Sequence, residues 1–443
     1  MKRKDILIVG FMLFAMFFGA GNLIFPVALG FMSGEHFWPA IFGFILTGVG
    51  LPLISVIVGS ISENGYRDLL KKIHPLYSVV FLMVIYLTIG PFFAIPRTAT
   101  TAYEMGIVPF LNHSTDLSLF LFTIGFFLIV LLVVLSPNRL ADSIGKYLTP
   151  TLLITIIILI VRAVIMYGSN EPQVADGLYQ KSEPFMTGFT EGYLTMDAIA
   201  SIAFSIIVLN AIRELGVTDK KALWSGTVKS SFLAVVLLGV IYTGLGWVGN
   251  RMSVPDAIPV NQNLGTFLLQ LISKEAFGTF GIAMLGVIVF LSCLTTAIGL
   301  IAAVSEYFHG LIPAISYKMF AILFTVFSGL IANQGLDQVI ETSVPVLGII
   351  YPIAISTVLL IVVSLMIPSS RFSLQFPLII VALESGLSLI HKQGWMKMDW
   401  LEQLPLYHIQ FEWVLLLVAG YIIGQVISLL KPSPVLKFGA HNQ

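Results

Sequence analysis

The chain has 443 residues, of which 57% are hydrophobic and only 10% are charged, whereas a typical soluble protein carries about 25% charged residues. No soluble fold can bury that much apolar surface, so the composition predicts an integral membrane protein surrounded by lipid for most of its length. The formal net charge is zero and no basic block occurs, which argues against nucleic acid as a partner.

The first apolar segment begins near residue 6 and contains a weak point. Its stretch FFGAGNLIFP (17–26) includes Gly19, Gly21 and Asn22, three poor helix formers. In hydrocarbon a broken helix leaves backbone groups unpaired, so a break persists only where it lines a cavity or meets a ligand. Freed amides can bind an anion at the start of the resumed helix, and the freed carbonyls before it suit a cation. Close packing of two helices across small residues is the alternative explanation.

Twelve apolar windows are long enough to cross the roughly 30 Å hydrocarbon core of a bilayer. The N-terminal stretch MKRKDILIVG has no cleavage site typical of a signal peptide, so we predict that it is retained as the first span. With both termini in the cytoplasm, 16 of the 23 lysines and arginines fall in cytoplasmic segments, five in outer loops and two within spans, as the positive-inside rule expects. The windows are 6–31, 38–61, 77–104, 117–135, 143–167, 190–211, 223–248, 278–305, 314–332, 340–367, 373–391 and 409–430.

Two segments outside the spans are amphipathic at helical spacing. YRDLLKKIH (66–74) is interpreted as a surface helix on the cytoplasmic side. NQNLGTFLLQLISKEAF (261–277) is interpreted as a lid-like helix on the outer face.

Spans 3 and 6 each place an ionisable residue at membrane depth. Asp197 in span 6 lies in GYLTMDAIASIAF, and ionisable groups at this depth are functional candidates by default. A carboxyl satisfied by a neighbouring helix is the alternative. Arg97 in span 3 is interpreted as structural, either paired with Glu104 or capping carbonyls freed near Pro91 and Pro96.

Span 8 contains the polar stretch SCLTTAIG (292–299) inside an apolar helix. Its adjacent residues Thr295 and Thr296 offer hydroxyls which, together with carbonyl oxygens, form the neutral shell that a small alkali cation accepts. Threonines in membrane helices also commonly bond back to the preceding turn of their own helix, and that explanation stays open.

The strings FFGAGNLIFP, TIGPFFAIPRTATTAYEMG (88–106) and LTMDAIASIAF (194–204) resemble the bacterial branched-chain amino acid:cation symporter family, over essentially the whole chain. The resemblance implies an all-α integral membrane protein of 12 transmembrane helices with the leucine-transporter fold, a 5+5 inverted repeat plus two extra C-terminal helices. The first repeat (spans 1–5) would occupy 1–168, the second (spans 6–10) 190–367, and spans 11 and 12 would lie in 373–430, all within a single transmembrane domain. Interrupted helices at matching positions of such repeats mark the binding site of many secondary transporters.

The resemblance further implies a secondary active transporter in the bacterial cytoplasmic membrane, not an enzyme. It would import leucine, isoleucine and valine by cation symport, with Na⁺ as the coupling ion, no other cofactor and no obligate protein partner. The substrate would be bound at the breaks of spans 1 and 6 by Gly19, Ala20, Gly21, Asn22, Thr195, Met196, Asp197, Ala198, Ser201 and Phe204. The sodium ion would be held by oxygens of Ala15, Phe18, Ser292, Thr295 and Thr296.

Three alternatives stay open from the sequence. Proton coupling is one, because some proton-driven relatives replace the sodium ion with a lysine from span 5, and Lys146 stands near the start of that span. A channel would need a continuous polar pore, and no charged ring or filter-like repeat is present. A membrane enzyme would need clustered catalytic or metal-binding groups, but the seven histidines are scattered.

Overall fold

The computed structural model describes residues 1–111, 114–136, 149–181, 183–254, 262–430, 434–436 and 438. Apart from two short strands, all regular structure in these ranges is helical. The strands β1 (Ser369–Ser370) and β2 (Val435–Leu436) pair antiparallel. The helices are α1 (Arg3–Phe17), α2 (Ala20–Ser33), η1 (Gly34–His36), α3 (Phe37–Ile45), η2 (Leu46–Gly50), α4 (Leu51–Gly59), α5 (Tyr66–Ile73), α6 (Pro75–Leu87), η3 (Thr88–Phe92), α7 (Ala94–Gly106), η4 (Val108–Phe110), α8 (Asp116–Val134), α10 (Thr149–Tyr167), α11 (Leu178–Lys181), α12 (Pro184–Glu191), η7 (Gly192–Thr195), α13 (Asp197–Glu214), α14 (Lys220–Arg251), α15 (Leu264–Leu311), α16 (Tyr317–Ala332), α17 (Leu336–Met366), α18 (Arg371–Lys392), η8 (Tyr407–Ile409) and α19 (Glu412–Leu430).

Many of these helices are long enough and apolar enough to span a bilayer. Within the described ranges nine helical stretches are long and apolar enough, and the bent pair Pro184–Thr195 and Asp197–Glu214 raises the number to ten. The difference from the predicted twelve has a structural origin: α1 has only 15 residues before it breaks, Ala20–Gly59 forms one nearly continuous helical stretch, and α16 has only 16 residues. The count of twelve therefore stays a prediction.

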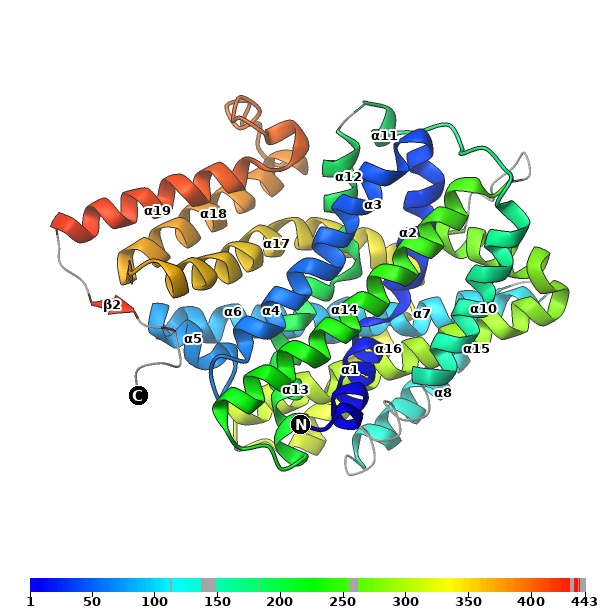
Figure 1. Ribbon diagram of the computed structural model, residues 1–443, viewed down its shortest axis with the longest axis horizontal. Helices are drawn as coiled ribbons and strands as arrows, with labels where there is room; N and C mark the ends of the chain where they lie inside the picture. Colours follow the sequence, from blue (N-terminus) through cyan, green and yellow to red (C-terminus); the bar gives the residue numbers. More distant parts are fainter. Residues whose placement is uncertain are drawn as a thin grey trace.

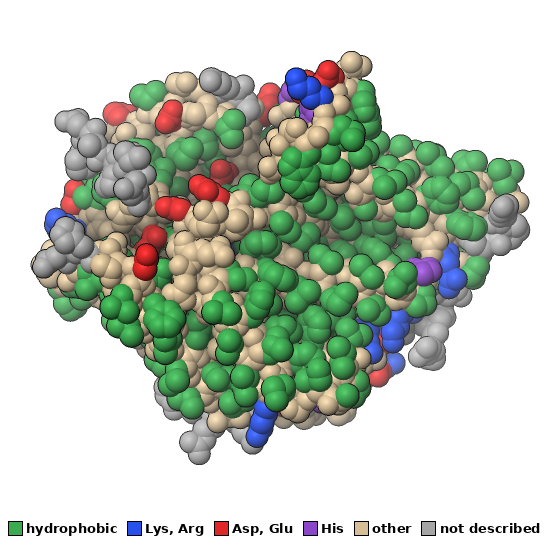
Figure 2. Space-filling view, turned by 180° about the vertical axis from the view of Figure 1, so that it is seen from behind, with side chains coloured by type: hydrophobic (Ala, Val, Ile, Leu, Met, Phe, Trp, Pro, Cys, Tyr) green, Lys and Arg blue, Asp and Glu red, His purple; other side chains and the backbone are tan. Residues whose placement is uncertain are grey.

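The surface of the molecule matches a lipid environment. Large apolar side chains point outward along the peripheral helices, for example Leu132 in α8 (62% exposed) and Ile165 in α10 (69% exposed). Hydrophobic side chains are spread over much of the face seen in Figure 2. Because a water-exposed surface of this kind would drive aggregation, lipid is the solvent that fits it.

The helices α1, α2 and α15 form the centre of the molecule. Much of α1 is fully buried, including Leu13, Phe14 and Ala15, and 78% of the most apolar window of α15 is buried. Helix α14 runs beside α2, whereas α18 and α19 form a pair next to α17 at the opposite edge of the molecule from α8 and α10 (Figure 1). The two short helices α1 and α2 are thus enclosed by longer helices.

The two predicted amphipathic segments are both helical. Helix α5 buries Leu69, Leu70 and Ile73, while the lysines lie in its last turn. The second segment forms the first part of α15, which then turns sharply at Gly278 (φ 62°, ψ −145°) before the apolar part of that helix begins.

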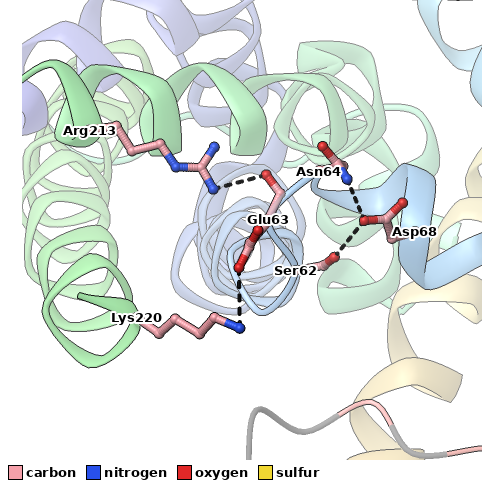
Figure 3. A network of polar contacts seen from close by, with 6 residues as sticks. All are labelled: Ser62, Glu63, Asn64, Asp68, Arg213 and Lys220. Carbon is pink, nitrogen blue, oxygen red and sulfur yellow. Dashed lines mark hydrogen bonds and ion pairs between the residues drawn. The ribbon is translucent and has the colours of Figure 1, made fainter. Parts of the chain in front are cut away.

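One end of the bundle carries a polar network that joins three helices (Figure 3). Arg213 near the end of α13 donates to the carbonyl of Glu63 at 3.1 Å, and Lys220 at the start of α14 lies 3.2 Å from the Glu63 carboxylate. In the same loop, Asn64 donates to Asp68 of α5 at 2.7 Å. Because these groups are solvent-exposed, the ion pair contributes at most about 1 kcal/mol, so it positions the loop more than it stabilises the fold.

Helices α2 and α14 approach closely at Gly30 and Gly246. A methyl group on Gly30 would lie only 1.8 Å from the carbonyl oxygen of Gly246. Small residues permit this backbone contact, which is a common means of helix association in membranes. The contact fixes α2, and with it one side of the break that precedes α2.

Replacing Gly30 with alanine is therefore expected to destabilise the protein. The added methyl group must push α2 and α14 apart, and overpacking of this kind costs about 1–3 kcal/mol or more. Thermal unfolding of the purified variant in detergent should show a lower midpoint than the wild type. The matched control is Gly239→Ala in α14, where a methyl group meets nothing within 4 Å; equal midpoints for the two variants would contradict this packing.

Candidate functional site

The predicted break in the first apolar segment is confirmed. Helix α1 ends at Phe17, Phe18 leaves the helical region with ψ 78°, and Gly19 is extended (φ −106°, ψ −160°) before α2 resumes at Ala20. The amide of Gly19 donates to the Phe17 carbonyl at 2.7 Å and to Asn22 Oδ1 at 3.2 Å. The next amides, in the first turn of α2, have no partner within the helix. The break thus presents amides to an anion, as the sequence indicates.

A second break divides the helical segment that contains Asp197. The 3₁₀ helix η7 ends at Thr195, Met196 adopts a left-handed conformation (φ 64°, ψ 7°), and α13 begins at Asp197 with a bend of 46°. A non-glycine residue in this conformation costs about 1–2 kcal/mol. Such strain is typical of functional sites, because the surrounding packing must hold it in place.

The two breaks meet at a small cavity in the centre of the molecule. Eight of the ten predicted substrate-binding residues line this cavity, whereas Ala198 and Ser201 do not; the Ser201 hydroxyl instead donates to the Ala198 carbonyl of its own helix at 2.6 Å. The lining residues are Met16, Phe17, Gly19, Ala20, Gly21, Asn22, Ala94, Arg97, Thr98, Thr195, Met196, Asp197, Ala200, Phe204, Thr296 and Leu300.

Asp197 connects the two breaks across the cavity. Its side chain, 3% exposed, accepts hydrogen bonds from Asn22 Nδ2 at 2.5 Å and from the Tyr242 hydroxyl at 3.0 Å. Asn22 also donates to the Tyr242 hydroxyl. The carboxyl is therefore bonded by neighbouring helices, as the alternative explanation for Asp197 expects, and it also lines the cavity. Sequence reasoning missed Tyr242, since a tyrosine in a long apolar helix carries no local signal of a partner.

Arg97 has partners that differ from both sequence predictions. Its guanidinium donates to the carbonyl of Leu194 at 2.7 Å and to that of Thr195 at 3.4 Å. It therefore caps carbonyls freed at the second break, not those near its own prolines. Glu104 does not pair with it: none of the ion pairs among the described residues joins Arg97 to Glu104.

The Arg97 guanidinium also lies beside the first turn of α2. A methyl group on Gly21 would lie 2.9 Å from Arg97 Nη2, and the guanidinium stacks over the ring of Phe25 with 5.4 Å to the centroid. Arg97 is 4% exposed and lines the cavity. The cavity thus has a buried cation next to the free amides of α2 and a buried carboxylate in Asp197.

The five predicted ion-binding residues lie together, on the other side of the first break. The Ser292 hydroxyl donates to the Phe18 carbonyl, and the hydroxyls of Thr295 and Thr296 each lie 3.3 Å from the Ala15 carbonyl oxygen. Four of the five residues are at most 1% exposed, and Thr296 is 8% exposed. Since every oxygen in the cluster is neutral, the group is suited to a monovalent cation.

Two further features weighed from the sequence are metal-binding clusters and Lys146. No group of three or more His, Cys, Asp or Glu side chains there could hold a metal ion. Lys146, the lysine considered for proton coupling, lies outside the described residues.

Comparison with known proteins places the chain among transporters. A family model described as branched-chain amino acid transport protein matches residues 2–431. A Staphylococcus saprophyticus protein, provisionally named a branched-chain amino acid carrier protein, is 50% identical over 97% of this chain and 98% of its own length.

Two solved structures show the same fold at low sequence identity. One is MhsT in complex with L-phenylalanine (16% identity, TM-score 0.58, covering 95% of this chain and 98% of that one). The other is Mhp1, a nucleobase-cation-symport-1 family transporter, in a closed conformation (11% identity, TM-score 0.58, covering 98% and 94%). Both have the leucine-transporter fold, so the resemblance noted from the sequence extends to the architecture. The helices, the paired breaks and these matches agree that this multi-pass bacterial membrane protein is a carrier, not an enzyme, and belongs to the branched-chain amino acid transport protein family.

Proposed function

We propose that the protein imports leucine, isoleucine and valine by sodium symport, through alternating access to the central cavity. One observation carries the proposal: two broken helices meet at a cavity that contains free helix amides, a buried guanidinium and a buried carboxylate. An amino acid is a zwitterion with one carboxylate and one ammonium group. Its binding site therefore needs a positive and a negative group at a fixed spacing. Because buried charges without a partner are costly, a site with both signs favours a zwitterion over an uncharged solute.

The substrate carboxylate rests on the amides at the start of α2 and faces Arg97. These amides carry the positive end of the helix dipole, and the guanidinium lies against Gly21 in the same turn. The substrate ammonium faces Asp197, whose Oδ2 is already oriented by Asn22 and Tyr242. In this arrangement each half-helix break supplies one end of the zwitterion.

The substrate side chain occupies the apolar part of the cavity, which is lined by Phe17, Ala94, Ala200, Phe204 and Leu300. Charged side chains are excluded because this surface offers them no partner. An apolar pocket distinguishes one methylene by only about 1–3 kcal/mol, so leucine, isoleucine and valine are all accepted.

The coupling ion is sodium, bound where α15 meets the end of α1. The carbonyls of Ala15 and Phe18 and the hydroxyls of Ser292, Thr295 and Thr296 supply the oxygens. The ion organises the C-terminal end of α1 while the substrate organises the start of α2, so both favour the same closed state, which is the requirement for coupling. One charge moving through 100 mV is worth about 2.3 kcal/mol, or roughly 40-fold to 50-fold accumulation of the amino acid.

The proposed architecture has twelve spans in the bacterial cytoplasmic membrane, with both termini in the cytoplasm. Spans 1–5 (1–168) and spans 6–10 (190–367) form inverted repeats, and spans 11 and 12 lie in 373–430. Support comes from the two breaks, which fall in span 1 and span 6, the first span of each repeat. The strained residue Met196 is placed to act as a hinge between η7 and α13.

Competition for uptake tests the substrate class. In proteoliposomes, unlabelled isoleucine and valine are expected to displace labelled leucine, whereas lysine and glutamate leave its uptake unchanged. Competition by the charged amino acids as strong as that by valine would contradict the apolar pocket. Uptake that does not saturate would point instead to a channel.

Replacing Arg97 with lysine is expected to weaken leucine binding about tenfold or more. Lysine keeps the charge but loses the planar fork that reaches the Leu194 and Thr195 carbonyls, and one hydrogen bond to a charged group is worth about 1.5–3 kcal/mol. The measurement is the leucine concentration that half-saturates uptake. The matched control is Arg213→Lys, where an exposed guanidinium also binds a backbone carbonyl; equal effects in both variants would remove Arg97 from the substrate site.

A further inference from the structure

Two glutamates lie buried between α18 and α19, outside the central cavity. Glu384 in α18 is 6% exposed and Glu412, the first residue of α19, is 5% exposed. Each carboxyl group lies within electrostatic reach of the other, across the contact between α18 and α19. Among the ion pairs found in the described residues, none includes either glutamate.

Several polar atoms at this place have no partner. Oε2 of Glu384 accepts a weak bond from Ser385 at 3.4 Å, whereas Glu384 Oε1 and Glu412 Oε2 are buried without a hydrogen bond among the described residues. Ser388 lies one turn further along the same face of α18 and is 5% exposed. Its hydroxyl has no hydrogen-bond partner among the described residues, although the Tyr407 hydroxyl is nearby. Buried polar groups are normally satisfied, so these atoms leave the pair open to a further hydrogen-bonding partner.

The charges around the pair do not neutralise it. The groups that face it are Lys392 of α18, Tyr407 of η8 and Tyr193 of η7, and Glu402 of the intervening loop lies near Tyr407. Lys392 is exposed and lies over the Tyr407 ring, 5.7 Å from its centroid. Glu402 is engaged by His391 at 3.1 Å. At least one negative charge therefore remains inside a poorly solvated contact.

We propose that Glu384 and Glu412 form a proton-binding pair that holds one shared proton, separate from the central cavity. Two adjacent buried carboxylates cannot both stay ionised, because repulsion and desolvation act together against the second charge. A proton is the occupant that fits, since it bonds one carboxyl to the other and needs no coordination shell. An alkali ion would need several more oxygens than the hydroxyls of Ser388 and Tyr407 supply.

The pair is in contact with the segment that moves in the proposed transport cycle. Phe411, immediately before Glu412, packs its ring against Phe189 of α12 with centroids 4.7 Å apart. Glu412 also faces Tyr193, which stacks on Tyr351 of α17 at 4.3 Å. Loss of the proton would separate the start of α19 from α18 and loosen the start of α19 from α12 and η7. This step, which makes transport depend on pH, rests on the proposed function; the proton site itself does not.

Infrared difference spectroscopy on the purified protein tests the proton site without any transport. The wild type is expected to show the carbonyl band of a protonated carboxyl, which disappears as the pH is raised. In the Glu384→Gln/Glu412→Gln double variant that band should be lost. In each single variant it should disappear at a lower pH than in the wild type, because the remaining carboxyl stays buried but no longer has a charged neighbour. The control Glu402→Gln, at a 55% exposed side chain of the same region, should keep the band.

Two infrared results would overturn the proposal. One is a titration in the Glu384→Gln/Glu412→Gln double variant that is identical to the wild type. The other is removal of the band by sodium or potassium at fixed pH, which would assign the pair to an alkali ion. As a second measurement, the double variant should transport leucine with a flattened pH profile and an unchanged half-activating sodium concentration. A shifted sodium dependence with an unchanged pH profile would overturn the link to α12.

Discussion

Replacing Asp197 with asparagine is expected to weaken leucine binding by about 30-fold to several thousand-fold. Asparagine can still accept the bonds from Asn22 and Tyr242, so the packing of α2, α13 and α14 is preserved while the negative charge that faces the substrate ammonium is removed. Truncating one member of a buried charge pair costs about 2–5 kcal/mol, and each 1.4 kcal/mol is a factor of ten in affinity. Equilibrium binding of labelled leucine to the purified variant measures the loss.

The control for this variant is Asp68→Asn in the polar network at the end of the bundle (Figure 3). Asp68 also accepts two side-chain hydrogen bonds, at 2.7 Å and 3.2 Å, but it lies away from the cavity. Its substitution should leave leucine binding unchanged. Wild-type affinity in Asp197→Asn would assign the substrate ammonium to another group.

The second large effect is expected at the ion cluster. In the double variant Thr295→Ala/Thr296→Val, two of the oxygens that face the carbonyls of α1 are removed. The sodium concentration that half-activates leucine uptake should rise at least about tenfold, since each lost oxygen ligand is comparable to a hydrogen bond to a charged group, about 1.5–3 kcal/mol. The protein should remain folded, because valine keeps the shape of threonine and alanine adds no bulk.

Thr325→Val provides the matched control for that variant. The Thr325 hydroxyl is buried in α16 and bonds back to the Ala321 carbonyl of its own helix at 2.6 Å, which is the ordinary role of threonine in an apolar helix. Its loss should leave sodium activation unchanged. Thr295 also bonds back to its own helix, to the Ser292 carbonyl at 2.9 Å, so an unaltered sodium response in Thr295→Ala/Thr296→Val would leave it with that ordinary role alone.

The first break could be predicted from the sequence because its signals are local. Gly19, Gly21 and Asn22 are poor helix formers, and the structure places the break at Phe18 and Gly19. The meeting of Thr295 and Thr296 with Ala15 could be anticipated only from the resemblance to a known family, because 280 positions separate Thr295 from Ala15. Periodicity alone carries no information about such a contact.

Other parts of the site depend on tertiary packing and had no local signal. Arg97 reaches carbonyls 97 and 98 positions away, and nothing around it in the sequence indicates span 6. The left-handed Met196 is a residue type that ordinarily avoids this conformation. The number of spans could not be counted from the sequence for a different reason. Hydropathy measures the length of apolar segments, but α1 breaks after 15 residues and Ala20–Gly59 continues through a tight turn. The ends of the helices therefore do not coincide with the ends of the apolar windows.

Accumulation of labelled leucine in proteoliposomes, with the sodium and proton gradients imposed independently, distinguishes sodium-coupled from proton-coupled transport. We predict that an inward sodium gradient at equal pH drives leucine above its equilibrium concentration, and that a proton gradient without sodium does not. Accumulation that follows the proton gradient alone, or equal leucine on both sides of the membrane under every gradient, would contradict sodium-coupled transport at the paired helix breaks.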